Sequence, residues 1–278
     1  MKKINRRSFL AAAGLTAAAL ALTACGGSAS STASSTASSA ASSEAASTSA
    51  AAELTTVEAG KLTMATNAAF PPYEMTTDAG EFEGIDIDTA KAIAEKLGLE
   101  LQIDDMDFDA ALLSVQQGKA DIVMAGVTVT DERKAVMDFS DSYATGIQSI
   151  IVSEGSDITS PDDLAGKKIG TQRGTTGYIY CSDDFGDDAV VAYDDGLTAV
   201  QALKNGQVDA VVIDNAPAKE FVAANPGLVI LDTSYAEEDY AIGLAKGSAL
   251  EDAVNAALEE LKADGTLQSI VDKYITAE

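Results

Sequence analysis

The stretch VQQGKADIVMAG (115–126) returns later in the chain as LKNGQVDAVVID (203–214), and this repeat decides the fold class. In both copies an aliphatic residue is followed three residues later by glycine and three residues after that by aspartate. An apolar run of strand type comes next. The repeat indicates two α/β lobes of related build, although a helix, a glycine and a strand in succession also occur within single-sheet α/β folds.

The chain from about residue 60 onward alternates predicted strands with predicted helices. Apolar runs predict strands at 62–66, 99–103, 120–126, 147–152, 167–172, 189–194 and 209–214. Helical periodicity predicts helices at 86–98, at 109–117 and within 248–265. Uninterrupted apolar strands between helices indicate parallel sheets that are buried on both faces. A single sheet would need an unusually long series of such units, so two lobes are favoured.

Two facing lobes place the carboxyl ends of their strands on a shared cleft, where open α/β sheets bind ligands. Gly126 and Asp214 each come five residues after the aspartate of their repeat, so we expect them on opposite walls. Arg133 follows the first of these strands, although the chain has only 18 basic residues against 44 acidic ones. Arg133 and Asp214 on opposite walls would suit a zwitterionic ligand.

Residues 1–24 have the pattern of an export signal, with four basic residues before an apolar stretch of 16 residues. A bilayer span takes about 20 apolar residues. The tetrapeptide LTAC (22–25) resembles the lipobox of bacterial lipoproteins, which implies that Cys25 is lipidated; an ordinary signal peptide with an incidental cysteine is the alternative. RRSFL (6–10) also resembles a twin-arginine signal, so the export route stays open.

The segment 25–59 contains Cys25 and then a stretch that is almost entirely alanine and serine. Such a composition cannot bury enough apolar surface to offset the entropy lost on folding, so we predict a disordered tether. A coil of this length has a root-mean-square span of about 30 Å. The tether would therefore let a folded domain move over a membrane surface.

Composition excludes several classes of function. Without the basic residues of the signal, 14 basic residues remain against 44 acidic ones, a net charge of −30 that argues against nucleic acid as a partner. The chain has no histidine, which excludes Ser-His-Asp triads and histidine-liganded zinc. With Cys25 acylated, Cys181 has no partner for a disulfide. We expect no cofactor and no metal site.

Motifs along the folded part resemble those of the solute-binding proteins of ABC importers for polar amino acids, from about Lys61 to Tyr274. They are TNAAFPPYE (66–74), GIDIDTAKAIAEKLG (84–98), FDAALL (108–113), TVTDERK (128–134), DFSD (138–141), GKKIGTQRGTTG (166–177) and DAVVIDNAPA (209–218). The resemblance implies a type II periplasmic-binding-protein fold, with two lobes of mostly parallel sheet flanked by helices. We expect one lobe at 60–146 plus 237–278, the other at 147–236, and hinge strands near 143–149 and 233–240.

The resemblance also implies residue roles. Arg133 would bind the ligand's α-carboxylate, for which the guanidinium fork is well matched. Asp214 would receive the α-ammonium group. Thr128 and the backbone at Ala125 and Gly126 would add hydrogen bonds.

Two further groups of residues complete the implied site. Thr175 and Thr176 stand at a predicted helix N-terminus, where free N–H groups favour an anion. Phe70 and Phe108 would sandwich the ligand side chain. Purely structural roles remain open for several of them: Thr128 and Thr176 as caps, and both phenylalanines as core residues.

The side chain of the ligand is the least determined feature. Asn67 and Gln172 stand where the family recognises side-chain polarity, and an aspartate often replaces Asn67 in relatives that bind lysine or arginine. We therefore predict a neutral polar amino acid such as glutamine. A basic amino acid is the alternative, because Glu74 could bring a carboxylate into the pocket. An acidic ligand would need a second base such as Arg173.

We expect the extracytoplasmic substrate-binding component of an ABC importer, a monomer that is lipid-anchored to the outer face of the cytoplasmic membrane and delivers its ligand to a permease. A dehydratase-like enzyme of the same fold is an alternative, with Glu74 as a possible acid. No activated nucleophile is visible, so we predict no catalytic residue and no enzyme. An amino-acid sensor is a third possibility; a sensor would normally continue into a membrane helix, and the sequence stops at Glu278.

Overall fold

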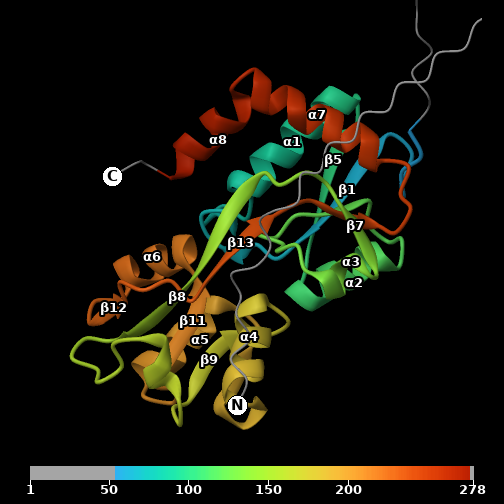
Figure 1. The fold of residues 1–278 in the computed structure, drawn as a ribbon. Helices are drawn as coiled ribbons and strands as arrows, with labels where there is room; N and C mark the ends of the chain where they lie inside the picture. The colour runs from blue at the N-terminus through green and yellow to red at the C-terminus, as the bar shows by residue number, and fades with distance from the viewer. Residues whose placement is uncertain (1–53, 276–278) are drawn as a thin grey trace, which may run out of the picture. The chain divides into compact units, whose positions relative to one another are not determined.

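Two mixed β-sheets with their flanking helices account for most of residues 54–275, the part of the chain that the computed structural model describes (Figure 1). The predicted signal, Cys25 and nearly all of the tether lie outside the described residues. Within 54–275, none of the helices has the length and apolar character needed to cross a membrane.

The first sheet has five strands and carries the N-terminal part of the described chain. In spatial order its strands are β5 (Glu100–Asp105), β1 (Lys61–Thr66), β6 (Ile122–Val123), β14 (Gly243–Ala245) and β7 (Met137–Phe139). Its helices are α1 (Ile85–Leu97), α2 (Phe108–Gln116), α3 (Asp131–Lys134), α7 (Glu251–Ala263) and α8 (Thr266–Tyr274). A small antiparallel sheet accompanies it, formed by β2 (Ala69–Phe70), β3 (Glu74–Thr76) and β4 (Phe82–Glu83).

The second sheet has six strands from the middle of the chain. They are β10 (Val190–Tyr193), β9 (Ile169–Gln172), β11 (Ala210–Asp214), β8 (Ala144–Ser153) and β12 (Leu228–Ile230), with β13 (Ala236–Tyr240) also paired to β8. Its α-helices are α4 (Thr176–Phe185), α5 (Gly196–Lys204) and α6 (Asn215–Ala224). Two 3₁₀ turns, Pro161–Leu164 and Asp187–Ala189, connect the elements, and Ser160 is the N-cap of the first.

Each sheet is mixed, whereas the sequence predicted mostly parallel sheets. The strands β5-β1-β6 and β10-β9-β11 are parallel, but β14 and β7 in the first sheet and β8, β12 and β13 in the second pair antiparallel. The strand predicted at 120–126 is also shorter, because the chain leaves the sheet after Val123 and turns at Gly126, whose φ is +56°. Only glycine adopts such a φ at little cost.

The repeat that predicted two related units appears in the structure as the same contact made twice. A side-chain oxygen of Asp121 accepts from the Thr63 amide at 2.7 Å, and a side-chain oxygen of Asp209 accepts from the Lys168 amide at 2.7 Å. We call this contact the aspartate clamp. In each unit the strand after the aspartate, β6 or β11, pairs in parallel with the strand at whose beginning the aspartate accepts its hydrogen bond, β1 or β9. The parallel parts of the two sheets are therefore built alike.

Two strands join the sheets. Residues Ala144–Gln148 of β8 pair with Tyr240–Ala236 of β13 in antiparallel register, while the rest of β8 pairs with β11 and β12. Figure 1 shows β8 and β13 side by side between the two groups of helices. They overlap the segments predicted as hinges, 143–149 and 233–240.

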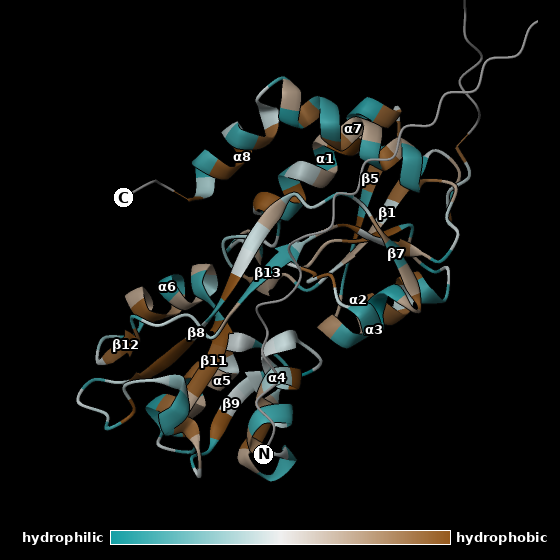
Figure 2. Cartoon of the chain, in the orientation of Figure 1, coloured by the Kyte–Doolittle hydropathy of each residue, from teal (hydrophilic) through white to brown (hydrophobic). Residues whose placement is uncertain are grey.

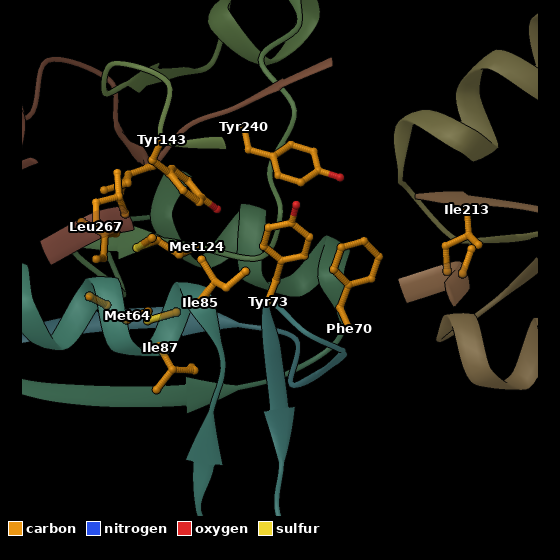
Figure 3. Packing of buried hydrophobic residues seen from close by; sticks show 14 of the residues in the cluster. Met64, Phe70, Tyr73, Ile85, Ile87, Met124, Tyr143, Ile213, Tyr240 and Leu267 are labelled. Carbon is orange, nitrogen blue, oxygen red and sulfur yellow. The ribbon is translucent and has the colours of Figure 1, made fainter. Parts of the chain in front are cut away.

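The core follows the apolar strands. Figure 2 shows hydrophobic residues concentrated on β8, β9 and β11, and hydrophilic residues along helices such as α8. The largest buried cluster runs from Leu62 and Ile93 in the first unit to Val211 and Phe221 in the second. Figure 3 shows that this cluster includes Phe70, Tyr73 and Tyr240, so the core reaches the region between the sheets.

Candidate functional site

One pocket brings together all eleven residues that the sequence predicted as ligand-binding, and Glu74 joins them. Its lining is Asn67, Phe70, Glu74, Phe108, Ala125, Gly126, Thr128, Arg133, Gln172, Thr175, Thr176 and Asp214. The first eight belong to the first-sheet unit, and the last four lie around β9, α4 and β11. The pocket therefore lies where the ends of strands from both sheets meet, which is the position predicted for a cleft between two α/β lobes.

Arg133 lies in the short helix α3, whose N-cap Thr130 accepts from the Arg133 amide at 3.2 Å. The guanidinium is buried; its Nη1 donates to Thr128 O at 2.7 Å and its Nη2 to Gly174 O at 3.2 Å. It also lies 5.3 Å from the centre of the Phe108 ring. Burial lowers the pKa of Arg133. Among the described residues no carboxylate forms an ion pair with this cation, so the pocket offers a positive group suited to an anionic ligand group.

Asp214 is the last residue of β11 and is also buried. Its carboxylate accepts hydrogen bonds from the Tyr240 hydroxyl and from Gln148 Nε2, the latter at 2.8 Å. Burial raises the pKa of Asp214 to about 7, and the nearby charge of Glu238 adds to the effect. A cation bound here would stabilise the ionised carboxylate.

Three hydrogen bonds cross directly between the walls of the pocket. Gln172 Nε2 donates to Asn67 Oδ1 at 2.8 Å, and the hydroxyl oxygens of Thr128 and Thr176 lie 3.4 Å apart. The third is the bond from Arg133 to Gly174 O described above. The two walls are therefore in contact in this structure, and Asn67 and Gln172 form part of that contact.

The aromatic part of the lining depends on Gly126. Phe70 is 6% and Phe108 is 5% exposed, and Phe70 stacks on Tyr73 with ring centres 5.9 Å apart. A Cβ at Gly126 would come within 2.9 Å of Cε1 of Phe70, and the positive φ of this residue also disfavours other side chains. Gly126 therefore allows Phe70 to lie directly against the pocket backbone.

Thr175 is both a pocket residue and the N-cap of α4. Its hydroxyl accepts from the Tyr178 amide at 3.4 Å and donates to Gln172 O at 2.8 Å. Thr176 follows as the first residue of the helix, so the N-terminus of α4 lies at the pocket. Thr128 caps no helix here; it bridges to Tyr240 and lines the pocket instead.

An acidic side chain beneath the pocket, Asp86, was not among the residues that the sequence predicted for the site. Asp86 is fully buried and accepts from the Gly126 amide at 3.0 Å and from the Tyr143 hydroxyl at 2.8 Å. Burial raises the pKa of Asp86 to about 6. Burial, and then the Asp86 charge, raise the pKa of Glu74 well above its usual range. Helical spacing offered a signal, because Asp86 precedes Ala90 and Ile93 on the apolar face of α1.

Of the two side chains whose access to the pocket the sequence left open, only Glu74 lines it. Arg173 has a side chain that is 55% exposed and lies 3.5 Å from Asp194. It contributes no charge to the lining. The pocket therefore contains one base, Arg133, and two acids, Glu74 and Asp214.

Comparisons with known proteins agree with this geometry. The family model of bacterial extracellular solute-binding proteins, family 3, matches residues 62–277. The arginine-binding extracellular protein ArtP of Bacillus subtilis is 33% identical over 230 residues, which are 78% of this chain and 87% of ArtP.

Solved structures cover the same region. An ancestral arginine-binding protein bound to arginine is 44% identical, with a TM-score of 0.74 over 78% of this chain and 98% of that one. An ancestral arginine-binding protein bound to glutamine is 43% identical, with a TM-score of 0.75 over 78% and 99%. All twelve residues of the pocket lining fall inside 62–277.

Proposed function

The chain belongs to the bacterial extracellular solute-binding proteins of family 3, and from this premise we propose that its pocket binds a free amino acid by both of its charged ends. It has the type II periplasmic-binding-protein fold and is the extracytoplasmic substrate-binding component of an ABC importer for polar amino acids. Binding and delivery require no catalysis, so we propose that the protein is not an enzyme.

The buried guanidinium of Arg133 carries this proposal. Within the described part of the chain the guanidinium of Arg133 donates to two carbonyl oxygens, whereas the group has five N–H donors. An α-carboxylate would supply the missing counter-charge and accept from the remaining donors. Asp214, which lines the same pocket, would then bind the α-ammonium group. A zwitterion satisfies both charges at once.

We propose that binding closes the two lobes, 60–146 plus 237–278 and 147–236, on each other through β8 and β13. The contacts from Gln172 to Asn67 and from Arg133 to Gly174 O would form on closure. Closure would also remove both charged ends of the ligand from water, which strengthens their interactions with Arg133 and Asp214. The closed form would then dock on the permease as a monomer.

For the ligand side chain we now favour a cation, with arginine first. Phe70 and Phe108 both line the pocket, and aromatic faces attract a guanidinium. Glu74 lines the pocket and so supplies the carboxyl group on which the alternative of a basic ligand depended. Relatives that bind arginine support this choice. A neutral polar amino acid remains the second candidate, because an ancestral arginine-binding protein was solved with glutamine.

We also propose that Cys25 is lipidated and anchors the protein to the outer face of the cytoplasmic membrane. The support is the motif LTAC (22–25) and the Ala/Ser-rich segment that follows it. Lipidation of Cys25 would supply at least two acyl chains, and stable attachment takes more than one.

A thermal-shift screen of the purified protein, freed of bound ligand, against the twenty amino acids tests the function. A ligand present at 100 times its dissociation constant adds about 2.7 kcal/mol of stability, which such a screen detects. We expect the largest shift with arginine. A shift with glutamine but none with arginine or lysine would reject the cationic ligand. No shift with any amino acid would reject amino-acid binding and return attention to the enzyme and sensor alternatives.

A further inference from the structure

Glu238 lies behind the pocket on β13 and is 6% exposed. One carboxylate oxygen, Oε2, accepts both from Thr128 Oγ1 at 3.2 Å and from Gln148 Nε2 at 3.0 Å. The other oxygen, Oε1, is buried with no hydrogen-bond partner among the described residues. Glu238 is absent from the pocket lining, so it acts on the pocket through the groups that it holds.

Gln148 connects Glu238 to the residue assigned to the α-ammonium group. Its Nε2 also donates to Asp214 Oδ2 at 2.8 Å, so its two N–H groups serve two different carboxylates. The Tyr240 hydroxyl holds the other oxygen of Asp214, and Figure 3 shows Tyr240 pointing its hydroxyl toward the unit that carries Ile213. Asp214 is thus oriented by two side chains from the strands that join the sheets.

The hydrogen bond to Glu238 also fixes what Thr128 can offer a ligand. A threonine hydroxyl has one hydrogen and two lone pairs. Because a carboxylate can only accept, that hydrogen points to Glu238 and away from the pocket. The Thr176 hydroxyl, 3.4 Å away, must then donate to one of the two lone pairs of Thr128 Oγ1. The other lone pair can accept from an ammonium group, and the hydroxyl has no hydrogen left to donate to a carboxylate.

We propose that Glu238 is a positioning residue that makes this end of the pocket select an α-ammonium group over an α-hydroxyl or α-keto group. It holds Thr128 as an acceptor and, through Gln148, holds Asp214 in place. An ammonium group supplies hydrogens to both acceptors. An α-hydroxyl has a single hydrogen, so one acceptor would face a lone pair, and an α-keto oxygen supplies none. This inference rests on the proposed amino-acid binding and deepens it.

The test compares each amino acid with its α-hydroxy analogue by calorimetric titration, using L-arginine with argininic acid and L-glutamine with its α-hydroxy analogue. Glu238→Met removes the acceptor while keeping similar side-chain length. Glu237→Met is the matched control, because Glu237 is the adjacent, exposed glutamate on the same strand. We expect Glu238→Met to reduce the preference for the amino acid at least tenfold, and Glu237→Met to leave it unchanged.

Thr128→Val provides a second test that does not depend on the folding of the Glu238 variant. Both ligands carry the α-carboxylate. If the Thr128 hydroxyl donated to that carboxylate, its loss would weaken the binding of both ligands equally. If the hydroxyl is held as an acceptor, its loss should weaken mainly the binding of the amino acid, by about tenfold more than the binding of its α-hydroxy analogue. Equal losses with Thr128→Val, or an unchanged preference in folded Glu238→Met, would overturn the proposal. If the unaltered protein bound neither amino acid, the proposed function itself would fail.

Discussion

Lowering the pH from 8 to 5 should weaken amino-acid binding, because Asp214 takes up a proton. Its pKa is raised to about 7 because the carboxyl is buried and lies near the charge of Glu238. The α-ammonium group needs the ionised form of Asp214. Above pH 8 that form already predominates in the empty protein, so affinity is at its maximum. Below pH 7 a bound proton must first leave, so affinity falls as the pH falls.

The magnitude follows from the position of this pKa. At pH 5, two pH units below a pKa of about 7, only about 1% of the empty protein has Asp214 ionised. The dissociation constant should therefore rise about 100-fold between pH 8 and pH 5. One pKa unit corresponds to 1.36 kcal/mol, so the loss of binding free energy is about 2.7 kcal/mol.

Calorimetric titration at pH 8, 7, 6 and 5 measures this slope. Repeating the pH 6 titration in two buffers of different ionisation enthalpy should show release of nearly one proton per ligand bound, and release should be close to zero at pH 8. Asp214→Asn is the control variant: it should bind more weakly at pH 8 but lose the slope. A flat profile in the unaltered protein would refute the reasoning, and a slope that survives in Asp214→Asn would assign the titration to Glu74 and Asp86.

Three further outcomes are expected. Arg133→Ala should weaken binding by more than tenfold, since truncating one partner of a desolvated charge pair costs on the order of 2–5 kcal/mol; calorimetry checks this, with exposed Arg173→Ala as the control that should change nothing. The empty protein should melt at a higher temperature at pH 5 than at pH 8, because Asp86 (pKa about 6) and Asp214 (pKa about 7) keep protons in the folded state that the unfolded chain releases near pH 4; an Asp214→Asn variant with the same pH dependence would contradict the Asp214 part. Cys25→Ser should release the protein into the medium or leave it unprocessed, and a variant that still incorporates labelled fatty acid would disprove the anchor.

The sequence predicted which residues share the pocket, because their positions follow from chain geometry. Arg133 and Asp214 stand out as charges placed just after buried strands, and strands of this kind end at a common edge. The motifs then supplied the partners, such as Phe70 and Gln172, that lie far apart along the chain. All of these residues reached the same pocket.

Other features depend on contacts that the local sequence does not specify. The antiparallel pairing of β8 with β13 arises from how the chain crosses twice between the sheets, and no local pattern encodes it. The sequence EED (237–239) does not say which acid is buried. Alternation along a strand could have indicated it, since Glu238 shares a face with the buried Tyr240.

The duplicated clamp made by Asp121 and Asp209 bears on ligand chirality. Each unit delivers the residue five positions after its clamp to the pocket, Gly126 on one wall and Asp214 on the other. Two walls of nearly equal build thus present different groups to the ligand's α-carbon. With Arg133 on the carboxylate, Asp214 on the ammonium group and the aromatic pair on the side chain, three substituents of one carbon are fixed in a set order. The mirror-image amino acid could satisfy only two of these proposed contacts at a time, so we expect the pocket to bind L- in preference to D-enantiomers.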